Sequence, residues 1–492
     1  MERLSELYFG ELEAFDEARN ETDYFSNTFV VPESISISSL RKNRKFIIVG
    51  RKGAGKTALQ MYFAQKLAED GYSTAFFRFA EDMRAGDFTQ LSKTQSHISY
   101  VSAANEKNLF LNYDFRDVWE RVILNKVAEA LSERGHENKF TSFVRPKQSK
   151  LANIFAGLTK NLSIKLSGEA YGIAVDLGFG LSNSGSDGVE LSIGDYNRAT
   201  RTLFSEHCRG LKLYFFVDEL VFSRLDGSAD QVTIKAAMVR DIVKTLRELN
   251  AFAVKSDLDF HFICSLRPEI RNLLNEYDSE IGKVVDGKDV NISWYIQGND
   301  ESPLLLDVFR RKIEKSSLLS GSQDIVYTDF VEQSLRFGNA SMSIGEFIKT
   351  NTWGRPRDLV RLLNSVAKGS PNATRIGEDQ IKAGLDDYSR ASAKELIDEL
   401  SVTHGKRILT ALKKGIRKKT YNSRDEFLAT LPDSGVNEEK LFDELFLLGV
   451  IGGVQTDAGN YFWAHRGESY FKDHYQVRIH PALWNEFGIR GT

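Results

Sequence analysis

Cysteine is scarce in this chain. Only Cys208 and Cys264 occur among the 492 residues, and they form no spaced pair and no cluster with histidine. This scarcity disfavours a disulfide-stabilised scaffold and a zinc site, because both need several cysteines or histidines at short spacings. A reducing compartment is therefore the expected environment.

The chain also lacks an excess of charge of one sign and any long apolar run. Lysine and arginine number 65 against 68 aspartates and glutamates, which leaves a net charge of -3. No chain-wide field favours nucleic acid or a membrane surface, so any basic surface must be local. No stretch of about 18 successive apolar residues occurs, and residues 1–6 lack the basic start of an export signal. We expect a cytoplasmic protein without a membrane partner, long enough for about two to four domains.

A complete phosphate-binding pattern is present at residues 50–57. These residues read Gly-Arg-Lys-Gly-Ala-Gly-Lys-Thr, after an apolar run at 46–49 and before a helical pattern at 58–67. The three glycines permit a tight loop whose backbone N–H groups face phosphate oxygens, and the helix that follows adds its positive dipole end. Lys56 would reach the β- and γ-phosphates, and the hydroxyl of Thr57 suits Mg2+. A chance glycine-rich turn is the alternative, but the complete pattern favours a nucleotide site.

The predicted nucleotide-binding residues of this loop are Gly50, Arg51, Lys52, Gly53, Ala54, Gly55, Lys56, Thr57 and Ala58.

A second apolar strand ends in two carboxylates. Residues 211–217 are mostly apolar and are followed by Asp218 and Glu219. Ligands of parallel α/β sheets bind outside the carboxyl ends of the strands, so this strand would carry Asp218 to the edge where the phosphate loop begins. Asp218 is expected to hold Mg2+, and Glu219 is expected to orient and polarise the attacking water. The alternative is a carboxylate pair that caps the next helix.

A third strand pattern at residues 260–268 follows a helical pattern at 231–250. Near its end, Ser265 is a candidate to hydrogen-bond the γ-phosphate or the lytic water, and Arg267 is a candidate to read the γ-phosphate charge. A plain polar strand end with a surface arginine is the alternative, because Ser-x-Arg is a short signal.

Residues 353–364 predict a helix with arginines at its start. Pro356 suits the first turn, and Leu359, Leu362 and Leu363 share one face. A helical lid built on this segment could bring Arg357 onto a γ-phosphate and so report ATP against ADP.

The order of these motifs resembles the AAA+ ATPases of the origin-recognition type and the related STAND signalling ATPases. The resemblance implies that Ser265 is sensor 1 and that Arg357 is sensor 2 and binds nucleotide. It also implies either that Arg267 acts in cis or that a neighbouring subunit delivers an arginine. A role in bacterial antiviral defence through a partner effector is implied as well. The motifs that carry the resemblance are Gly50 to Thr57, Asp218-Glu219, Ser265 and Gly354-x-x-Arg357, followed by an apparent winged helix.

The distance from Thr57 to the strand at 211–217 exceeds what the resemblance requires. A strand at 74–79 and a helix at 115–131 fill part of it, and we expect an insertion at about residues 140–200. Within it, residues 161–196 alternate apolar residues with glycine, serine and polar residues, which predicts β-hairpins or a partly mobile excursion. Such a ribbon is either a solvated hairpin or a contact surface for another subunit or partner.

The segment before the phosphate loop packs over the adenine in the resembled ATPases. Tyr24, Phe25 or Phe29 could do so here, and plain core packing is the alternative for each of them.

Residues 389–492 predict a winged-helix-like module. Helical patterns at 407–416, 424–431 and 438–448 precede strands at 450–454 and 461–465, which flank a turn at 456–460. A basic cluster at 406–424 could neutralise phosphates. The expected recognition helix is acidic instead, which favours a solvated face or a protein-docking module over DNA binding. The cluster comprises Lys406, Arg407, Lys413, Lys414, Arg417, Lys418, Lys419 and Arg424, and the acidic residues are Glu438, Glu439, Asp443 and Glu444.

These patterns together predict an α/β fold with a P-loop NTPase parallel sheet core, a helical lid and a C-terminal winged-helix (α+β) domain. The predicted divisions are 1–40 near the nucleotide, 41–300 as the core, 301–388 as the lid and 389–492 as the winged helix. ATP would bind with Mg2+ between core and lid.

The predicted activity is ATP hydrolysis, with a catalytic set of Lys56, Glu219, Ser265 and Arg267. It would drive a conformational switch that controls self-assembly into a homo-oligomer or a separate effector protein. The alternatives are a DNA-binding initiator or loader and an ATP-bound scaffold that does not hydrolyse.

Overall fold

The structure, a computed structural model, forms two compact units. The sheet unit comprises Ser34–Arg51 and Leu59–Ile292, and the terminal unit comprises Met1–Glu33, Lys52–Ala58 and Ser293–Thr492. No helix in the described ranges is long and apolar enough to cross a membrane. The described residues are 2–42, 44–82, 114–144, 163–166, 168–178, 189–220, 229–277, 279–295, 303–321, 323–337, 340–404, 407–431, 437–455 and 460–489.

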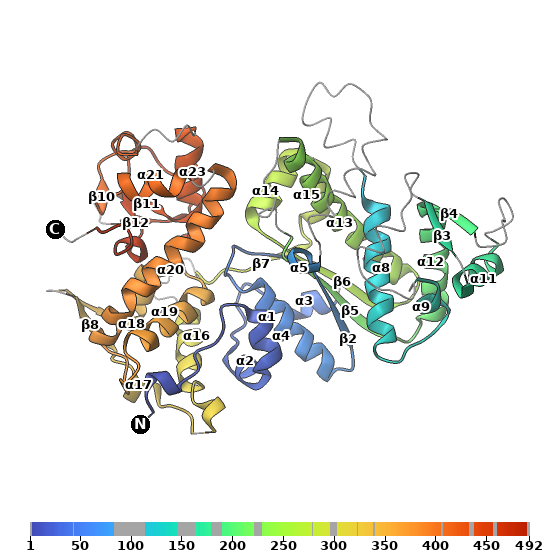
Figure 1. The fold of residues 1–492 in the computed structure, drawn as a ribbon, viewed down its shortest axis with the longest axis horizontal. Helices are drawn as coiled ribbons and strands as arrows, with labels where there is room; N and C mark the ends of the chain where they lie inside the picture. The colour runs from blue at the N-terminus through green and yellow to red at the C-terminus, as the bar shows by residue number, and fades with distance from the viewer. Residues whose placement is uncertain are drawn as a thin grey trace. The chain divides into compact units, whose positions relative to one another are not determined.

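The sheet unit is built on a five-stranded parallel sheet in the order β2-β5-β6-β1-β7 (Figure 1). The pairing of Val49 with Leu266 and of Val217 with Cys264 makes β1, β6 and β5 end at one edge. The predicted α/β fold with a parallel sheet core is therefore confirmed. The strands are β1 (Ile47–Val49), β2 (Ser73–Arg78), β5 (Lys212–Asp218), β6 (Asp259–Leu266) and β7 (Asp289–Asn291).

Helices cover both faces of this sheet, which explains the continuous apolar run of β5. Leu213, Phe215 and Val217 lie in the core beneath α8 (Arg116–Ser132) and α13 (Ala229–Lys255). On the other face, Phe63 of α4 (Lys56–Glu69) contacts the rings of Tyr214 and Phe216 at 5.3 and 6.1 Å. Because successive strand residues point to opposite faces, both sets are buried and the strand ends are left for a site.

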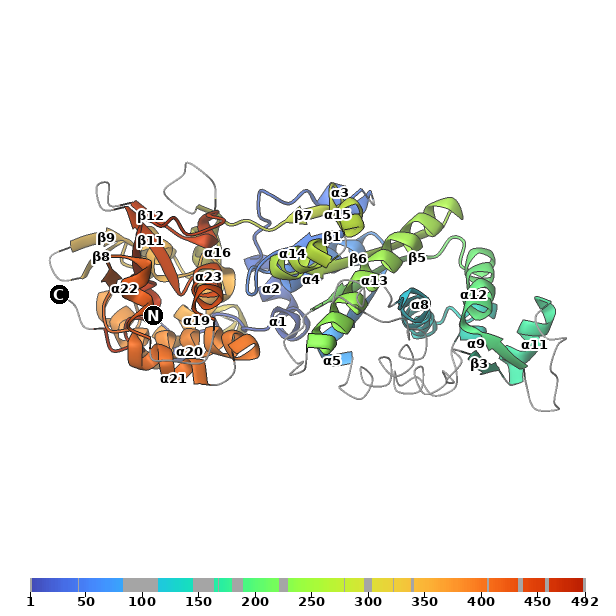
Figure 2. The same cartoon turned by 90° about the horizontal axis from the view of Figure 1, so that it is seen from above.

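In the described part of the chain between β2 and β5, helices are combined with the antiparallel strands β3 and β4 (both labelled in Figure 1; β3 is labelled in Figure 2). The predicted ribbon at 161–196 is confirmed for these two strands and is wrong for residues 171–176, which are helical. Ile173 and Ala174 are buried and Ala170 and Leu177 pack beside them, a spacing of three to four residues that belongs to a helix. Residues 161–162 and 179–188 lie outside the described ranges. The elements are α5 (Phe79–Asp82), α9 (Lys139–Val144), β3 (Ser163–Leu166), α11 (Gly168–Asp176), β4 (Val189–Ser192) and α12 (Ile193–His207).

The remaining helices of the sheet unit are α3 (Ile37–Arg41), α14 (Pro268–Tyr277) and α15 (Ser279–Val285).

The terminal unit joins helices from both ends of the chain. α19 (Pro356–Gly369) begins at Pro356 as predicted and packs along α20 (Glu378–His404). α20 runs across residues 388–389, where the sequence predicts a module boundary, and the division into lid and winged helix stays a prediction. The other elements of this part are η1 (Leu4–Glu6), α1 (Ala14–Asn20), α2 (Thr22–Thr28), α16 (Pro303–Glu314), η2 (Leu318–Ser320), α17 (Tyr327–Phe330), β8 (Ser334–Phe337), β9 (Ala340–Ser343) and α18 (Ile344–Asn351).

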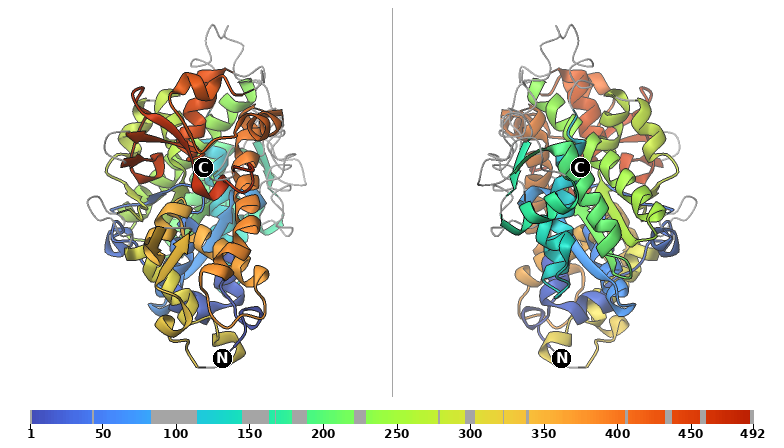
Figure 3. Two further views of the ribbon diagram at one scale, coloured as in Figure 1. Left: turned by 90° about the vertical axis from the view of Figure 1, so that its left-hand side faces the viewer. Right: turned by 90° about the vertical axis from the view of Figure 1, so that its right-hand side faces the viewer.

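The last part of the terminal unit combines three helices with a four-stranded antiparallel sheet in the order β10-β13-β11-β12 (Figure 3, left, red). The helices lie where the sequence predicts them, whereas β10 and β13 are additional. Residues 456–459 of the predicted turn lie outside the described ranges. The elements are α21 (Arg407–Gly415), β10 (Thr420–Tyr421), α22 (Arg424–Leu428), α23 (Glu438–Leu448), β11 (Ile451–Gln455), β12 (Asn460–Phe462), η3 (Ala464–Arg466), β13 (Gln476–Ile479) and η4 (Pro481–Leu483).

Candidate nucleotide site

The loop at residues 50–57 joins β1 to α4. Gly53 and Gly55 have φ angles of 77° and 93°, which glycine adopts without the steric cost that a Cβ imposes. The Gly50 N–H donates to the Leu266 carbonyl oxygen at 3.1 Å and so ties the start of the loop to β6. Lys56 and Thr57 are the first two residues of α4 and lie at its positive dipole end.

Trp294 contacts this loop and is not among the residues predicted from the sequence. Its indole N–H donates to the Ala54 carbonyl oxygen at 2.8 Å, and the ring is buried. A Cβ on Gly55 would lie 4.0 Å from the same ring. No local motif marks Trp294, because the strand that it follows, β7, was not among the strands predicted from the sequence.

The ends of β5 and β6 bring Asp218 and Ser265 together. The Ser265 hydroxyl donates to Asp218 Oδ1, and both side chains are buried. Ser265 also pairs in register with Ile48 of β1, so β6 lies between the strand that leads into the loop and the strand that carries Asp218. Ser265 can therefore orient the Asp218 carboxylate. The sequence predicted the shared edge but not this hydrogen bond.

Glu219 follows β5 directly and has a φ angle of 57°, a left-handed conformation that non-glycine residues seldom adopt. Its Oε1 lies 3.9 Å from Nη2 of Arg78, which pairs more closely with Glu81 at 2.6 Å. Arg78 is the last residue of β2 and is in register with Asp218. Arg78 is not among the residues predicted from the sequence, although an arginine at the end of the strand at 74–79 is a usable signal.

The arginines after β6 differ in their surroundings. Nη1 of Arg267 lies 3.6 Å from Glu269 Oε1, at the same sheet edge as Ser265. Arg271 forms ion pairs with Asp286 at 3.1 Å and with Asp289 at 2.9 Å. Arg271 is therefore engaged within its own unit.

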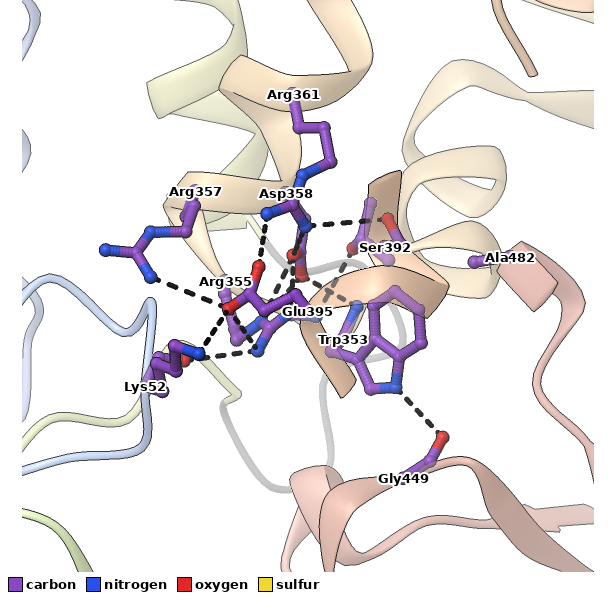
Figure 4. Close-up of polar contacts among 12 residues, drawn as sticks. Lys52, Trp353, Arg355, Arg357, Asp358, Arg361, Ser392, Glu395, Gly449 and Ala482 are labelled. Atoms are coloured by element: carbon purple, nitrogen blue, oxygen red, sulfur yellow. Dashed lines mark hydrogen bonds and ion pairs between the residues drawn. The ribbon is translucent and has the colours of Figure 1, made fainter. Parts of the chain in front are cut away.

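Two arginines at the start of α19 contact the phosphate loop (Figure 4). A Cβ on Gly53 would lie 3.3 Å from Arg357 Cβ and 3.4 Å from Arg355 Cδ. Arg355 Nη1 also donates to the Lys52 carbonyl oxygen at 3.2 Å. The close approach thus depends on glycine at position 53, and it brings the predicted residues Lys52, Gly53 and Arg357 together.

Glu395 of α20 lies among these cations. Lys52 Nζ lies 3.7 Å and Arg357 Nη1 lies 3.5 Å from its Oε1, and Arg361 Nη2 pairs with its Oε2. Burial alone would raise the pKa of the Glu395 carboxyl, but Arg355, Arg361, Lys52 and Arg357 lower it to about 2. Glu395 is not among the residues predicted from the sequence, because no local motif marks it.

Tyr24 and Phe25 are buried in the terminal unit. The Tyr24 hydroxyl donates to the Lys312 carbonyl oxygen at 3.2 Å, and its ring meets Tyr8 edge-on at 4.8 Å. Core packing accounts for both residues.

Most described members of the C-terminal basic cluster have partners nearby. Lys413 pairs with Glu486, Lys418 pairs with Glu426 at 2.9 Å, and Lys419 lies over the Trp484 ring. Glu438 and Glu439 lie in the first turn of α23, where they complement the helix dipole. Lys406 lies outside the described ranges. These contacts favour a solvated or protein-facing surface over a phosphate-binding one.

Comparisons with known proteins give little beyond the fold. No protein-family model matches the chain, and no curated protein matches it. Among solved structures, Cdc6p from Pyrobaculum aerophilum is similar over 90% of this chain and 86% of that chain, with 10% sequence identity and a TM-score of 0.35. A similarity at this level does not indicate the function of this chain. The function proposed below therefore rests on the geometry of the site.

Proposed function

We propose that this protein binds ATP with Mg2+ at the loop of residues 50–57 and hydrolyses it slowly as a conformational switch. The observation that carries the proposal is the loop, with left-handed Gly53 and Gly55 between a parallel strand and the start of a helix. The loop begins at the sheet edge where β5 ends in Asp218. Glycine-lined backbone N–H groups, Lys56, a hydroxyl and a carboxylate are the groups that a magnesium nucleotide requires.

Each polar residue has a distinct role in this proposal. Lys56 binds the β- and γ-phosphates, and Asp218 and Thr57 supply the oxygen atoms that would hold Mg2+. When bound, Mg2+ neutralises charge on the phosphates. Ser265 orients Asp218 through its hydrogen bond. Glu219 orients the attacking water and accepts its proton, and Arg267 contributes positive charge at the same edge.

The path of the chain supports a switch. Residues 52–58 belong to the terminal unit, whereas β1 and the rest of α4 belong to the sheet unit. Nucleotide phosphates in this loop would thus act on the segment through which the chain passes between its two units. In the proposal, Arg357 closes on the nucleotide and the altered state presents a surface for self-assembly or for a partner effector, as in bacterial antiviral defence.

A DNA-bound initiator is the second candidate function for a protein with these motifs. It needs free cations on the C-terminal module, and the partners of Lys413, Lys418 and Lys419 do not support it. A scaffold that binds ATP without hydrolysis is the third reading.

The test is Mg2+-dependent phosphate release by the wild type and by Glu219→Gln. The amide keeps the size of the side chain but cannot accept the proton, so turnover should fall about 10²-fold or more while ATP still binds. Asp257→Asn is the matched control. Asp257 is also an acidic residue with a left-handed φ angle, of 54°. It precedes β6 at the opposite edge of the sheet, so its variant should keep wild-type turnover.

Absence of Mg2+-dependent phosphate release from the wild type would favour the scaffold reading. Equal turnover by the wild type and Glu219→Gln would remove Glu219 from the mechanism.

A further inference from the structure

Four cationic side chains converge on one buried carboxylate in the terminal unit (Figure 4). The carboxylate is that of Glu395, whose side chain is 10% exposed. Lys52 comes from the phosphate loop, whereas the three arginines come from the first turns of α19. The ion pairs of Glu395 are those with Lys52, Arg355, Arg357 and Arg361.

The cations differ in how much they depend on Glu395. Arg355 is already neutralised by Asp358, which accepts from its Nε at 3.0 Å and from its Nη2 at 2.7 Å. Among the described residues, the other partners of Arg357 are the half-exposed Glu13, at 3.5 Å, and the Leu12 carbonyl oxygen. Lys52 also pairs with Glu399 at 3.0 Å. Glu395 is therefore the buried anion that Arg357 and Lys52 share.

This cluster is attached directly to the phosphate loop. Arg355 donates to the backbone of Lys52, and the side chains of Arg355 and Arg357 lie against Gly53. A carboxylate and a phosphate present the same kind of oxygen acceptors to guanidinium and ammonium groups. The cations that hold Glu395 thus form an anion site beside the loop, and a carboxylate of the chain itself occupies it.

We propose that Glu395 holds Arg357 and Lys52 when no nucleotide is bound, and that a phosphate group of the nucleotide competes with Glu395 for them. This inference rests on the proposed nucleotide function and adds a specificity-determining residue to it. A competing internal anion lowers the apparent affinity, because only the state in which Arg357 and Lys52 are released can bind the phosphate.

The competition also gives the switch an output. Glu395 belongs to α20, which packs against α21 and η4 of the C-terminal module. Release of Glu395 by phosphate would free the middle of α20 from the loop and from Arg357. Nucleotide binding would thereby change the contacts of α20, the helix that packs against the C-terminal module.

The experiment compares Kd values for ATP and AMP in the wild type and in Glu395→Gln. Removing the competing charge should lower the Kd for ATP about tenfold, within the usual range of coupling between sites. The Kd for AMP should stay unchanged, because AMP lacks the phosphates that Arg357 would contact. Asp387→Asn is the matched control, because Asp387 lies on the same helix but pairs with Lys368 at 2.6 Å and accepts from the Ser365 hydroxyl at 3.1 Å.

Glu395→Asp provides a second test in case Glu395→Gln does not fold. It keeps the charge but shortens the side chain, so it should give a Kd for ATP between those of the wild type and Glu395→Gln. Adding Arg357→Gln to Glu395→Gln should abolish the gain. An unchanged or raised Kd for ATP in folded Glu395→Gln or Glu395→Asp, with a wild type that binds ATP through Lys56, would overturn this inference and leave the proposed function intact. A wild type that does not bind ATP would overturn both.

Discussion

At the scale of single residues, the backbone of Glu219 is held in a left-handed conformation, with φ of 57°. For a residue with a Cβ this conformation costs about 1–2 kcal/mol. Such conformations concentrate at functional sites, where the surrounding structure enforces them. Glu219 directly follows Asp218, the last residue of β5, and its Oε1 lies 3.9 Å from Arg78 Nη2. Asp257 shares the left-handed conformation at the opposite edge of the sheet, so the role proposed for Glu219 rests on its place beside Asp218 and not on its φ angle alone.

His480 is a second residue whose setting has measurable consequences. Its ring stacks on Trp353 at 4.2 Å and meets Trp463 edge-on at 4.9 Å, and its Nδ1 accepts from the Ala482 N–H at 3.3 Å. Burial lowers the pKa of His480 well below its ordinary value of 6.5, and the nearby Arg466 and Arg355 act in the same direction. The folded protein therefore keeps this ring neutral.

We predict that stability falls in acid partly through His480. The unfolded chain binds a proton at His480 near pH 6.5, whereas the folded chain does so only at lower pH. Stability from this group is thus present above about pH 6.5 and is lost as the pH falls through the folded pKa. Urea unfolding at several pH values should give a shallower pH slope for His480→Asn than for the wild type. The exposed His136→Asn should keep the wild-type slope, and equal slopes for the wild type and His480→Asn would contradict this assignment.

At the scale of elements, a buried ion pair attaches the N-terminal helices to α16. Lys312 Nζ lies 2.8 Å from Glu17 Oε1, and the two side chains are 7% and 5% exposed. Glu17 also accepts from the Glu11 N–H at 2.7 Å, and Lys312 lies over the Tyr24 ring at 4.8 Å. Burial lowers the pKa of Lys312, and Glu17 partly opposes this shift.

Removing one partner of this pair should lower the free energy of unfolding far more than removing both partners. Lys312→Met leaves a buried carboxylate without its cation, which should lower the free energy of unfolding by about 3–5 kcal/mol. The double variant Lys312→Met/Glu17→Leu should recover most of that loss, because neither charge then remains buried. Chemical denaturation measures both. Lys315→Met, which breaks the more exposed pair with Asp324, should cost no more than about 1 kcal/mol. A double variant as unstable as Lys312→Met alone would contradict the account.

The elements that the sequence predicted well are those with a local cause. β1, β5 and β6 are runs buried on both faces, and α19 begins at a proline that suits its first turn. α20 was not predicted as one helix, because the sequence predicts a module boundary at residues 388–389. The helix is held by tertiary packing: a Cβ on Gly384 would lie 2.7 Å from the Val366 backbone, so this glycine permits a close crossing of α19 and α20.

In the site, too, features with a local sequence cause were predicted and features that depend on tertiary packing were not. The loop at 50–57 and the carboxylates after β5 were predictable, because their chemistry depends on residues adjacent in the chain. Glu395, Trp294 and Arg78 were not, because tertiary packing alone brings Glu395 to Lys52, Trp294 to Ala54 and Arg78 to Glu219.

At the scale of the whole molecule, the phosphate loop is the segment through which the proposed ATP switch would act. The loop residues 52–58 group with the terminal unit, while the strand that leads into them belongs to the sheet unit. The cations of α19 and the carboxylate of α20 meet the same loop. A ligand in this loop would therefore act on the side chains that α19 and α20 bring to it, and the proposed switch depends on that ligand being ATP.

Isothermal titration calorimetry of ATP with Mg2+ tests this claim most directly. The wild type should bind ATP with a defined stoichiometry. Lys56→Ala should weaken binding about 100-fold or more, because it removes charge-assisted bonds to the phosphates worth about 3 kcal/mol. Lys66→Ala, at the exposed end of α4 where Lys66 pairs with Glu69, should bind like the wild type. No heat of binding from the wild type, or the same affinity in Lys56→Ala, would contradict the account.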